Sequence, residues 1–378
     1  MMSDNVLRIA CIMGKWHGGG VESVVMNYYR NIDRTKIQFD FFCDADSTRI
    51  PYDEIESLSG RIIVIPPYQK MPDYYKTLVR EFKNGGYKIV HSHINAMSFF
   101  SLAAARKAGV PVRIAHSHST SSPHEWKKNI IKNLLRPLSK INSTDYFACS
   151  EVAAKWLFGK RTFCKNKITL LHNAIDLERF AFNAKSREEI RNEFKIEKDT
   201  VVLGHIGRFM PQKNHDFLID IFNEYHKLNK NSVLFLAGAG PLENDVREKV
   251  LAQGLSDSVI FAGQRKDADK LYMAFDVFLL PSLYEGLAVV AVEAQATGVP
   301  VFASDKVSPE TDLTDTLKML PIEKPEYWAA QIYSFINDEK TSRTSASAEK
   351  VLKLRARGYD IKAEGKKLAE MYEAFNMR

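Results

Sequence analysis

Two glutamates, Glu285 and Glu293, interrupt the otherwise apolar stretch PSLYEGLAVVAVEAQATGVP at residues 281–300. The run GLAVVAVEAQATG predicts a helix that is capped by Gly298 and ends before Pro300. Because this helix is apolar nearly all round, it should be buried, and an unpaired glutamate on it would be costly. Helical spacing places the two carboxylates at most about 12 Å apart and within about 80° of one direction. One long polar ligand could bind both; the alternative is a capping Glu285 and a solvent-facing Glu293.

Two permanent cations, Arg208 and Lys213, follow the apolar run VVLGHIG in the segment VVLGHIGRFMPQKN. Cations beside Gly207, at the end of a parallel strand, would neutralise a diphosphate. The alternative is that both are solvated surface charges. A second turn, with Gly238 and Gly240 in FLAGAGP, allows a ligand or a neighbouring helix to approach the backbone closely.

Three glycines, Gly18, Gly19 and Gly20, open a predicted helix in GKWHGGGVESVV. Backbone N–H groups at such a helix N-terminus can bind an anion. The pattern Gly18-x-Gly20-x-x-Ser23 approaches a dinucleotide-binding fingerprint, but Ser23 replaces its third glycine and four extra residues precede Gly18. The bland alternative is a flexible strand-to-helix turn.

Acidic residues downstream of this turn have two interpretations. Asp40 and Asp44 would be the ribose ligands of a dinucleotide site. The sequence DAD at 44–46 also has the form of a metal-binding DxD motif. Because it follows a strand of the first domain, we interpret it as a turn.

Alternating β-rich and helical segments must position these residues. The first series of strands runs from LRIACIM to ITLLHN, and a fresh series from VVLGHIG to VPVFAS follows the polar segment around NAIDLERF. Strands that are apolar on both faces favour parallel sheets covered by helices, hence two Rossmann-like domains at 1–175 and 176–358. The last segment, 359–378, predicts an amphipathic helix. Ligands of such domains bind at the carboxyl ends of the strands, where the loops described above lie.

Composition limits the classes of function. A chain of 378 residues with a net charge of +7 and a pI near 9.0 fits two domains with anionic partners. No run of about 18 apolar residues and no signal-like N-terminus occurs, so no membrane-spanning segment is expected. The cysteines are far apart, without a CxxC pair, which argues against a zinc site or a disulfide framework and fits a reducing cytoplasm. They are Cys11, Cys43, Cys149 and Cys164.

Taken in order, the motifs resemble those of the family 4 glycosyltransferases of the GT-B fold, in particular enzymes of bacterial capsule and exopolysaccharide biosynthesis. The resemblance covers nearly the whole chain. It rests on GGGVE, HSHST, HNAIDLERF, GRFMPQKN, GAGP, LLPSLYEGL…VEAQATGVPV and the terminal helix. It implies an α/β protein whose acceptor-binding and nucleotide-sugar-binding domains face each other across a cleft, with the last helix crossing back to the N-terminal domain.

The resemblance also implies roles for the charged residues. Arg208 and Lys213 would hold the donor diphosphate, Glu293 would accept hydrogen bonds from the ribose hydroxyls, and Glu285 would bind the transferred sugar. Further donor-binding positions implied by the resemblance are Gly18, Gly19, Gly20, Gly238, Gly240, Gln264, Gly286 and Leu287.

An active-site histidine is implied as well, at the end of a strand of the first domain. We favour His118, which is nearer the loop than His116, although the spacing does not decide between them. A histidine there can position the sugar or share a proton with the acceptor. Family members retain the anomeric configuration without a divalent metal or another cofactor, because cations and helix N-termini stabilise the leaving group. Relatives usually carry proline where Ala288 stands, so the donor, UDP- or GDP-linked, stays open.

A basic amphipathic helix is predicted over 125–141, in HEWKKNIIKNLLRPLSKIN, with a bend at Pro137. Its cations recur at i, i+4 spacing: Lys128, Lys132, Arg136 and Lys140. The pattern is typical of a helix on an anionic membrane surface and equally of a helix that covers a domain core with a solvated basic face. A membrane contact would fit a cytoplasmic protein on the inner face of the plasma membrane, with a saccharide or polyprenyl-diphosphate-linked acceptor. No nucleic-acid partner is expected.

Two other functions compete with a retaining glycosyltransferase. A NAD-dependent Rossmann dehydrogenase would need an uninterrupted fingerprint, which Ser23 and the four extra residues oppose. A non-catalytic nucleotide-sugar sensor would use every one of the same binding residues. Turnover separates the sensor from the enzyme.

Overall fold

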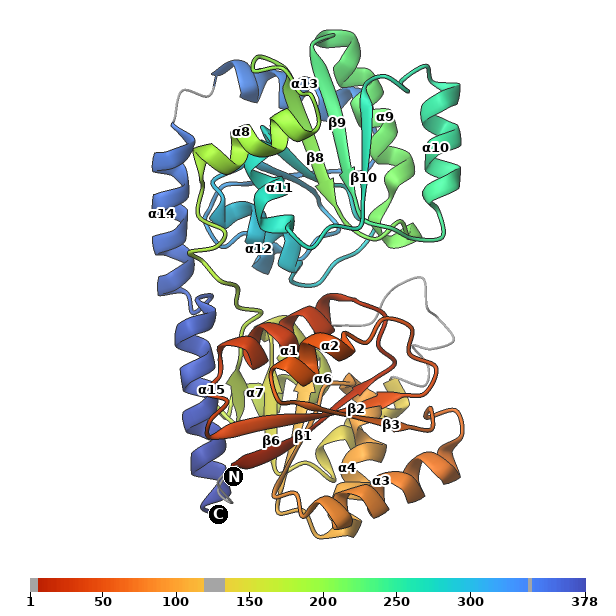
Figure 1. The fold of residues 1–378 in the computed structure, drawn as a ribbon, viewed down its shortest axis with the longest axis vertical. Helices are drawn as coiled ribbons and strands as arrows, with labels where there is room; N and C mark the ends of the chain where they lie inside the picture. Colours follow the sequence, from red (N-terminus) through yellow and green to blue (C-terminus); the bar gives the residue numbers. More distant parts are fainter. Residues whose placement is uncertain (1–5, 119–132, 339–341) are drawn as a thin grey trace. The chain divides into compact units, whose positions relative to one another are not determined.

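The computed structural model describes residues 6–118, 133–338 and 342–378. The chain divides into two compact units (Figure 1). Unit 1 comprises Met1–Ala174 together with Gly358–Arg378, and unit 2 comprises Ile175–Arg357.

Unit 1 is built on a seven-stranded sheet in the order β3-β2-β1-β4-β5-β6-β7. Its described strand pairs are parallel. Residues of β2 and β4 are buried along their whole length, including polar ones such as Asp40 and His91, as is usual for strands inside a parallel sheet. The strands are β1 (Leu7–Gly14), β2 (Ile37–Asp44), β3 (Arg61–Ile65), β4 (Ile89–Ser92), β5 (Val112–Ser117), β6 (Asp145–Ala148) and β7 (Ile168–Leu170).

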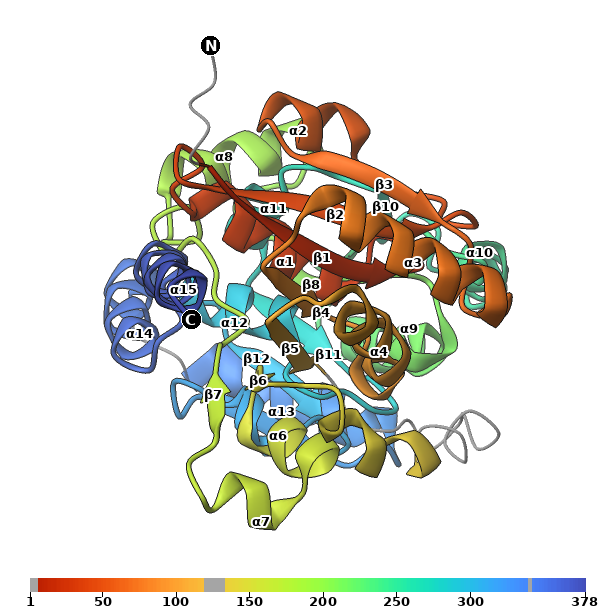
Figure 2. The same cartoon turned by 90° about the horizontal axis from the view of Figure 1, so that it is seen from below.

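Helices cover this sheet. An amphipathic pattern fixes α3, which buries Tyr74, Leu78 and Phe82 and lies beside α4 (Figure 2). The described helices of unit 1 are α1 (Gly20–Asn31), α2 (Tyr52–Ser57), α3 (Met71–Gly85), η1 (Asn95–Met97), α4 (Ser98–Ala108), η2 (Pro137–Lys140), α6 (Glu151–Phe158), α7 (Lys160–Phe163) and α15 (Ile361–Asn376).

The last helix, α15, is part of unit 1 and packs against α1. Its N-terminus is capped by the Asp360 side chain, which accepts from the backbone N–H of Lys362. Gly365 permits close approach, because a Cβ there would lie 3.0 Å from the carbonyl oxygen of Asn31. On the buried face, the Tyr372 hydroxyl lies 2.6 Å from a ring nitrogen of a histidine on β4. The C-terminal segment therefore completes the core of unit 1.

Unit 2 holds a six-stranded parallel sheet in the order β10-β9-β8-β11-β12-β13. The strands are β8 (Val201–Ile206), β9 (Ser232–Ala237), β10 (Val259–Gly263), β11 (Val277–Leu280), β12 (Val301–Ser304) and β13 (Leu317–Leu320). The described helices are α8 (Ala184–Glu193), η3 (Pro211–Lys213), α9 (His215–Leu228), α10 (Glu243–Ala252), α11 (Ala268–Ala274), α12 (Val289–Ala296), η4 (Pro309–Thr311), α13 (Pro325–Asp338) and α14 (Arg343–Ala356).

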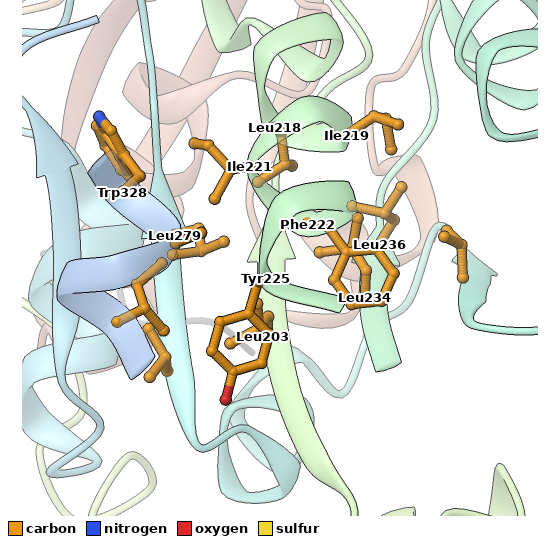
Figure 3. Packing of buried hydrophobic residues seen from close by; sticks show 14 of the residues in the cluster. Leu203, Leu218, Ile219, Ile221, Phe222, Tyr225, Leu234, Leu236, Leu279 and Trp328 are labelled. Atoms are coloured by element: carbon orange, nitrogen blue, oxygen red, sulfur yellow. The ribbon is translucent and has the colours of Figure 1, made fainter. Parts of the chain in front are cut away.

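The core of unit 2 lies between this sheet and α9 (Figure 3). Leu203 and Leu279 from the strands meet Phe222 and Tyr225 from α9, and Trp328 of α13 closes one side. Each of these side chains is almost fully buried, and burial of one such side chain contributes about 1.5–3 kcal/mol. A rigid base therefore supports the loops at the strand ends.

In both sheets the strand order reverses at the first strand of the series. In unit 1, β1 lies between β2 and β4, and in unit 2, β8 lies between β9 and β11. Such reversal points are the usual ligand sites of open parallel sheets. Within the described residues, none of the helices combines the length and apolar character needed to cross a lipid bilayer.

Candidate active site

In unit 2, the loop after β8 is bonded to the loop after β11. The backbone N–H of Leu283 donates to the carbonyl of Gln212 over 2.8 Å, and the Gln212 side chain donates to the carbonyl of Tyr284 over 3.0 Å. The Asn214 amide donates to the carbonyl of Pro281 over 3.2 Å. Together these bonds fix the two loops that carry the predicted diphosphate and sugar ligands.

Lys213 and Glu285, predicted to bind different parts of the donor, form an ion pair with each other. Their side chains are only 15% and 12% exposed, so water screens the pair weakly. Arg208, on the same loop, is exposed. A diphosphate that pairs with Lys213 would compete with Glu285 for the ammonium. It would thereby free the carboxylate to accept hydrogen bonds from sugar hydroxyls.

Glu285 is not part of the helix that carries Glu293, and the helical geometry assumed for the pair is therefore wrong. Helix α12 begins at Val289, whereas Glu285 is extended and forms a parallel bridge with Val307. Its carbonyl accepts from the N–H of Ser308 over 3.0 Å. These tertiary backbone bonds leave residues 285–288 outside the helix despite their apolar pattern.

Glu293 lies on α12, where the hydroxyl of Tyr272 donates to its Oε2 over 2.8 Å. Burial raises the pKa of Glu293 to about 7, although the Tyr272 hydrogen bond and the positive charge of Arg179 both lower it. Arg179 itself pairs with Asp269. Hydroxyl groups that donate hydrogen bonds to such a carboxyl group would stabilise its ionised form and so lower its pKa.

Gly238 and Gly240 fit tightly against the loop after β8. Gly238 has φ of +144°, and a Cβ on it would lie 1.9 Å from the carbonyl oxygen of Gly207. A Cβ on Gly240 would lie 2.4 Å from the carbonyl oxygen of Phe209. The sequence suggested that a ligand or a neighbouring helix approaches these glycines. In the structure, the backbone of the neighbouring loop does so instead. A donor-binding role of these glycines stays a prediction.

The remaining positions predicted to bind the donor lie on the neighbouring loops of unit 2. Gln264 is exposed just after β10, which ends in Gly263 at φ +66°. Leu287 is 9% exposed, and the carbonyl of Gly286 accepts from Thr311 Oγ1 over 3.3 Å. A donor-binding role of these positions stays a prediction.

In unit 1, four histidines line adjacent strands at their carboxyl ends. His91 lies on β4 and His116 on β5, and His93 and His118 are the residues that directly follow these two strands. His91 Nε2 lies 3.0 Å from His116 Nδ1, and His93 Nδ1 lies 2.9 Å from His118 Nε2. The rings of His116 and His118 stack at 3.9 Å between centroids. Sequence reasoning missed His91 and His93, although the repeated HSH in KIVHSH and RIAHSH was a usable signal.

His118 is held by its main chain as well as by its ring. Its backbone N–H donates to Asn95 Oδ1 over 2.8 Å, and its carbonyl accepts from Cys149 Sγ over 3.4 Å. Burial lowers the pKa of His118 to about 3, so the ring is neutral at physiological pH. His118 is 8% exposed and His116 is 1% exposed. His118 is therefore the more accessible of the two candidates.

The glycine turn of unit 1 leads into α1, with Gly19 as its N-cap. Glu22 accepts hydrogen bonds from the backbone N–H groups of His17 and Gly19, each over 3.0 Å. Gly18 has φ of +73°, a conformation that favours glycine. A carboxylate of the chain itself thus occupies part of the predicted anion-binding turn.

Asp40 is not a ribose ligand, contrary to the interpretation of the turn as a dinucleotide site. It is fully buried within the sheet, where Arg8 Nε donates to it over 2.9 Å and the Tyr87 hydroxyl over 2.6 Å. Asp44 ends β2, and burial raises its pKa to about 7. The carbonyl of Asp44 accepts from the N–H of Ser47, which agrees with the interpretation of DAD as a turn.

Part of the predicted basic helix, residues 125–132 with Lys128 and Lys132, lies outside the described residues. In the remainder, residues 133–135 are helical and Pro137–Lys140 form the 3-10 helix η2. Lys140 donates to the carbonyl of Phe158 over 3.3 Å, so its ammonium is not on a solvated basic face. The guanidinium of Arg136 lies 5.9 Å from the ring centroid of Trp156.

Comparisons with known proteins show the family of the chain. Residues 18–179 match the family described as Glycosyltransferase Family 4, and residues 186–351 match the one described as Glycosyl transferases group 1. A protein of Bacillus subtilis (strain 168) assigned as the glycosyltransferase EpsF is 38% identical over 316 residues, 82% of each chain.

Two further relatives carry more specific names. An Escherichia coli enzyme named UDP-Gal:alpha-D-GlcNAc-diphosphoundecaprenol alpha-1,3-galactosyltransferase is 25% identical over 299 residues, 76% of each chain. The crystal structure of Anabaena HepE in complex with UDP-glucose superposes with a TM-score of 0.80 at 18% identity. It covers 97% of this chain and 100% of that one, which shows a shared GT-B fold of two Rossmann-like domains.

Proposed function

Because the chain belongs to the family 4 glycosyltransferases, we propose that it transfers a hexose from a nucleotide sugar to a saccharide acceptor with retention of configuration. The observation that carries the proposal is the loop pair of unit 2, where Lys213 and Glu285 are held together beside Arg208. Unit 2 is the proposed donor-binding part, and unit 1 the proposed acceptor-binding part.

The donor diphosphate binds at Arg208 and Lys213 in this proposal. As the bond to the sugar breaks, negative charge accumulates on the diphosphate, and the two cations stabilise it more in the transition state than in the ground state. Catalysis then needs no divalent metal and no cofactor besides the nucleotide sugar. Lys213 turns from Glu285 to the phosphates, and Glu285 binds the sugar hydroxyls.

The ribose binds at Glu293, whose carboxylate accepts from two vicinal hydroxyls. Tyr272 positions that carboxylate through its 2.8 Å hydrogen bond. His118, held by His93, acts on the acceptor side as the residue that orients the sugar or shares the acceptor proton. His116 is the alternative candidate for this role.

A UDP-linked donor and a polyprenyl-diphosphate-linked saccharide acceptor are the most specific part of the proposal. The support comes from the printed names of relatives, one a galactosyltransferase acting on a diphosphoundecaprenol-linked sugar and one a structure with UDP-glucose. Ala288, at 4% exposure directly before α12, leaves the identity of the sugar open. An acceptor of this kind would place the reaction at the inner face of the plasma membrane.

The test is release of nucleoside diphosphate from a panel of UDP- and GDP-sugars, with a lipid-linked saccharide as acceptor. We expect turnover with at least one donor, unchanged by EDTA. Lys213→Ala and Glu293→Gln should each abolish turnover without unfolding the protein. Lys227→Ala is the matched control, because this exposed lysine pairs only locally, with Glu224. Wild-type rates in either site variant would contradict the assignment.

A nucleotide-sugar sensor remains the alternative function, whereas family membership excludes the Rossmann dehydrogenase. A sensor would bind the donor with the same residues and release no diphosphate with any acceptor. In the enzyme, the anomeric proton of the product, followed by NMR, should show the configuration of the donor.

A further inference from the structure

The histidine cluster of unit 1 has properties that the proposed transfer reaction does not need. Three of its members, His91, His93 and His116, are 0%, 6% and 1% exposed. Among the described residues, the Nε2 atoms of His93 and His116 are buried without a hydrogen-bond partner. Leaving a buried polar atom such as His93 Nε2 unsatisfied costs about 1–3 kcal/mol, so a ligand that used this atom would stabilise the fold.

The strands bring the ligand atoms of these three rings together. His91 lies on β4 and His93 is the residue after its end, and their rings stack with 4.2 Å between centroids. His116 reaches the same place from β5, which pairs with β4 in parallel. One ring nitrogen from each residue lies within 4.8 Å of the others, and the His91 Nε2 and His116 Nδ1 atoms are 3.0 Å apart. Nitrogen ligands around tetrahedral zinc lie about 3.3 Å apart, given bonds of about 2.0–2.1 Å.

We propose that His91, His93 and His116 form a binding site for one divalent transition-metal ion of the zinc class. The ion would replace the hydrogen bond between His91 and His116 with two metal–nitrogen bonds. The three rings leave a fourth coordination position for water or for another ligand.

Tyr372 supplies the outer contact that such a site requires. Its hydroxyl lies 2.6 Å from His91 Nδ1, so His91 can donate from Nδ1 and keep the lone pair of Nε2 for the metal. Since Tyr372 belongs to α15, the ion would link the strands of unit 1 to its C-terminal helix. Metal binding should therefore stabilise unit 1.

The ligand set selects the kind of ion. Three imidazoles without a carboxylate favour zinc, cobalt, nickel or copper over magnesium, calcium or manganese. Burial lowers the pKa of all three rings, which leaves them neutral with lone pairs free to coordinate. The group of possible ligands contains no cysteine.

The first experiment uses the full-length protein after treatment with a chelator and dialysis. Titration with Co²⁺ should produce the visible absorption of a tetrahedral nitrogen-ligated cobalt ion, saturating at one ion per chain. Zn²⁺ should displace the cobalt and raise the thermal unfolding midpoint, whereas Mg²⁺ should do neither. Absence of the cobalt absorption in the wild-type protein would overturn the proposal, whatever the variants show.

Variants locate the ion. His93→Gln and His116→Gln should lose the cobalt absorption, while His17→Gln and Cys164→Ser should keep it and exclude other thiol and imidazole sites. Tyr372→Phe should keep the absorption but weaken Co²⁺ affinity by about 10- to 100-fold, as expected for an outer contact. If both cluster variants, with wild-type circular dichroism, bound Co²⁺ as the wild-type protein does, the site would lie elsewhere. These readouts do not involve sugar transfer, so they fail independently of the proposed function.

Discussion

Glu293 is the residue whose protonation should control donor binding. Burial raises its pKa to about 7 from an ordinary value of 4.5, against the opposing effects of Tyr272 and Arg179. Asp269 nearby adds to the increase. In the proposed complex, ribose hydroxyls donate hydrogen bonds to the ionised carboxylate, so the donor should bind preferentially to the deprotonated protein.

The first prediction concerns the pH dependence of UDP affinity, measured by calorimetry. In the wild-type protein, affinity should rise about tenfold per pH unit below pH 7 and level off above it, because the ionised fraction of Glu293 rises in the same way. Glu293→Gln should bind UDP weakly with no such slope. Asp44→Asn is the control, since burial raises the pKa of Asp44 to about 7 as well. An unchanged slope in Glu293→Gln would show that another group titrates.

The same pKa has a consequence for stability, with a definite sign. The folded protein binds the proton of Glu293 more tightly than the unfolded chain, in which the pKa is near 4.5. Below that pH, ionisation of Glu293 does not lower the free energy of unfolding. As pH rises through about 7, it does. Without UDP, Glu293→Gln should therefore melt higher than the wild-type protein at pH 8. At pH 4.5 the two melting temperatures should agree.

The second prediction tests Tyr272 as the residue that positions Glu293. Tyr272→Phe removes the hydroxyl that donates to the carboxylate, so the pKa of Glu293 should rise further and the rise in UDP affinity should move to higher pH. If the pKa rises by one unit, the ionised fraction at pH 7 falls from about one half to about one tenth, so we expect affinity at pH 7 to fall about fivefold. Tyr333→Phe, at a side chain that is 40% exposed, is the matched control. A uniform loss of affinity at all pH values would instead indicate damaged packing.

At the scale of elements, the binding loops of unit 2 depend on backbone packing at glycines. A Cβ on Gly240 would lie 2.7 Å from the backbone nitrogen of Phe209 as well as close to its carbonyl oxygen. A Cβ on Gly286 would meet nothing within 4 Å. Neither glycine has the positive φ that would itself penalise a side chain. The two positions therefore differ in packing alone.

The third prediction compares Gly240→Ala with Gly286→Ala. The alanine at 240 should force the loop after β8 to move and destabilise unit 2 by about 1–3 kcal/mol, a typical cost of overpacking. The alanine at 286 should leave the unfolding free energy within about 0.5 kcal/mol of the wild-type value. Denaturant unfolding measures both. Equal stability of the two variants would mean that the loop adapts without cost.

Elements were predictable from the sequence where local pattern decides them. Apolar runs predicted the parallel sheets, and the apolar segment ending at Gly298 predicted α12. The start of α12 was not predictable, because Glu285 is drawn out of the helix by its bridge with Val307. Lys140 likewise meets the carbonyl of Phe158 only through the fold. Helical periodicity carries no information about such tertiary partners.

The histidine cluster depends on the order of the strands. β4 and β5 are neighbours in the sheet, but nothing local in either HSH segment fixes their register. The same register of the two segments brings the ring of His91 to that of His116 and the ring of His93 to that of His118. Sequence reasoning considered one strand at a time and so could find only half of the cluster.

At the scale of the whole molecule, each unit draws its core from distant parts of the chain. Unit 1 takes its last helix from beyond unit 2, since the chain returns to it at Gly358. Tyr372 and Leu368 of that helix are 1% and 2% exposed, and Phe375 lies 6.4 Å from Phe147 between ring centroids. Unit 2 is continuous in sequence and needs no such return.

The fourth prediction follows from this difference. Deletion of 358–378 should unfold unit 1 and leave unit 2 folded, because it exposes the surface that the buried side chains of α15 cover. Loss of three such side chains costs roughly 5–9 kcal/mol at about 1.5–3 kcal/mol each, which is comparable to the whole stability of a typical domain. Deletion of Met377 and Arg378 alone is the control, since Met377 is 82% exposed and the ion pair of Arg378 with Asp145 is formed by a side chain that is 58% exposed.

Tryptophan fluorescence can separate the two units in this experiment. Trp328 is the one tryptophan in the sequence of unit 2, and replacing the other three with phenylalanine leaves it as a reporter. In the long deletion, Trp328 should keep a cooperative unfolding transition. Trp16 and Trp156, followed in a Trp328→Phe protein, should lose theirs, because the sheet of unit 1 would lack the contacts of Tyr372 with His91 and Phe39. A cooperative transition of unit 1 at the wild-type midpoint would mean that its sheet and remaining helices are stable without α15.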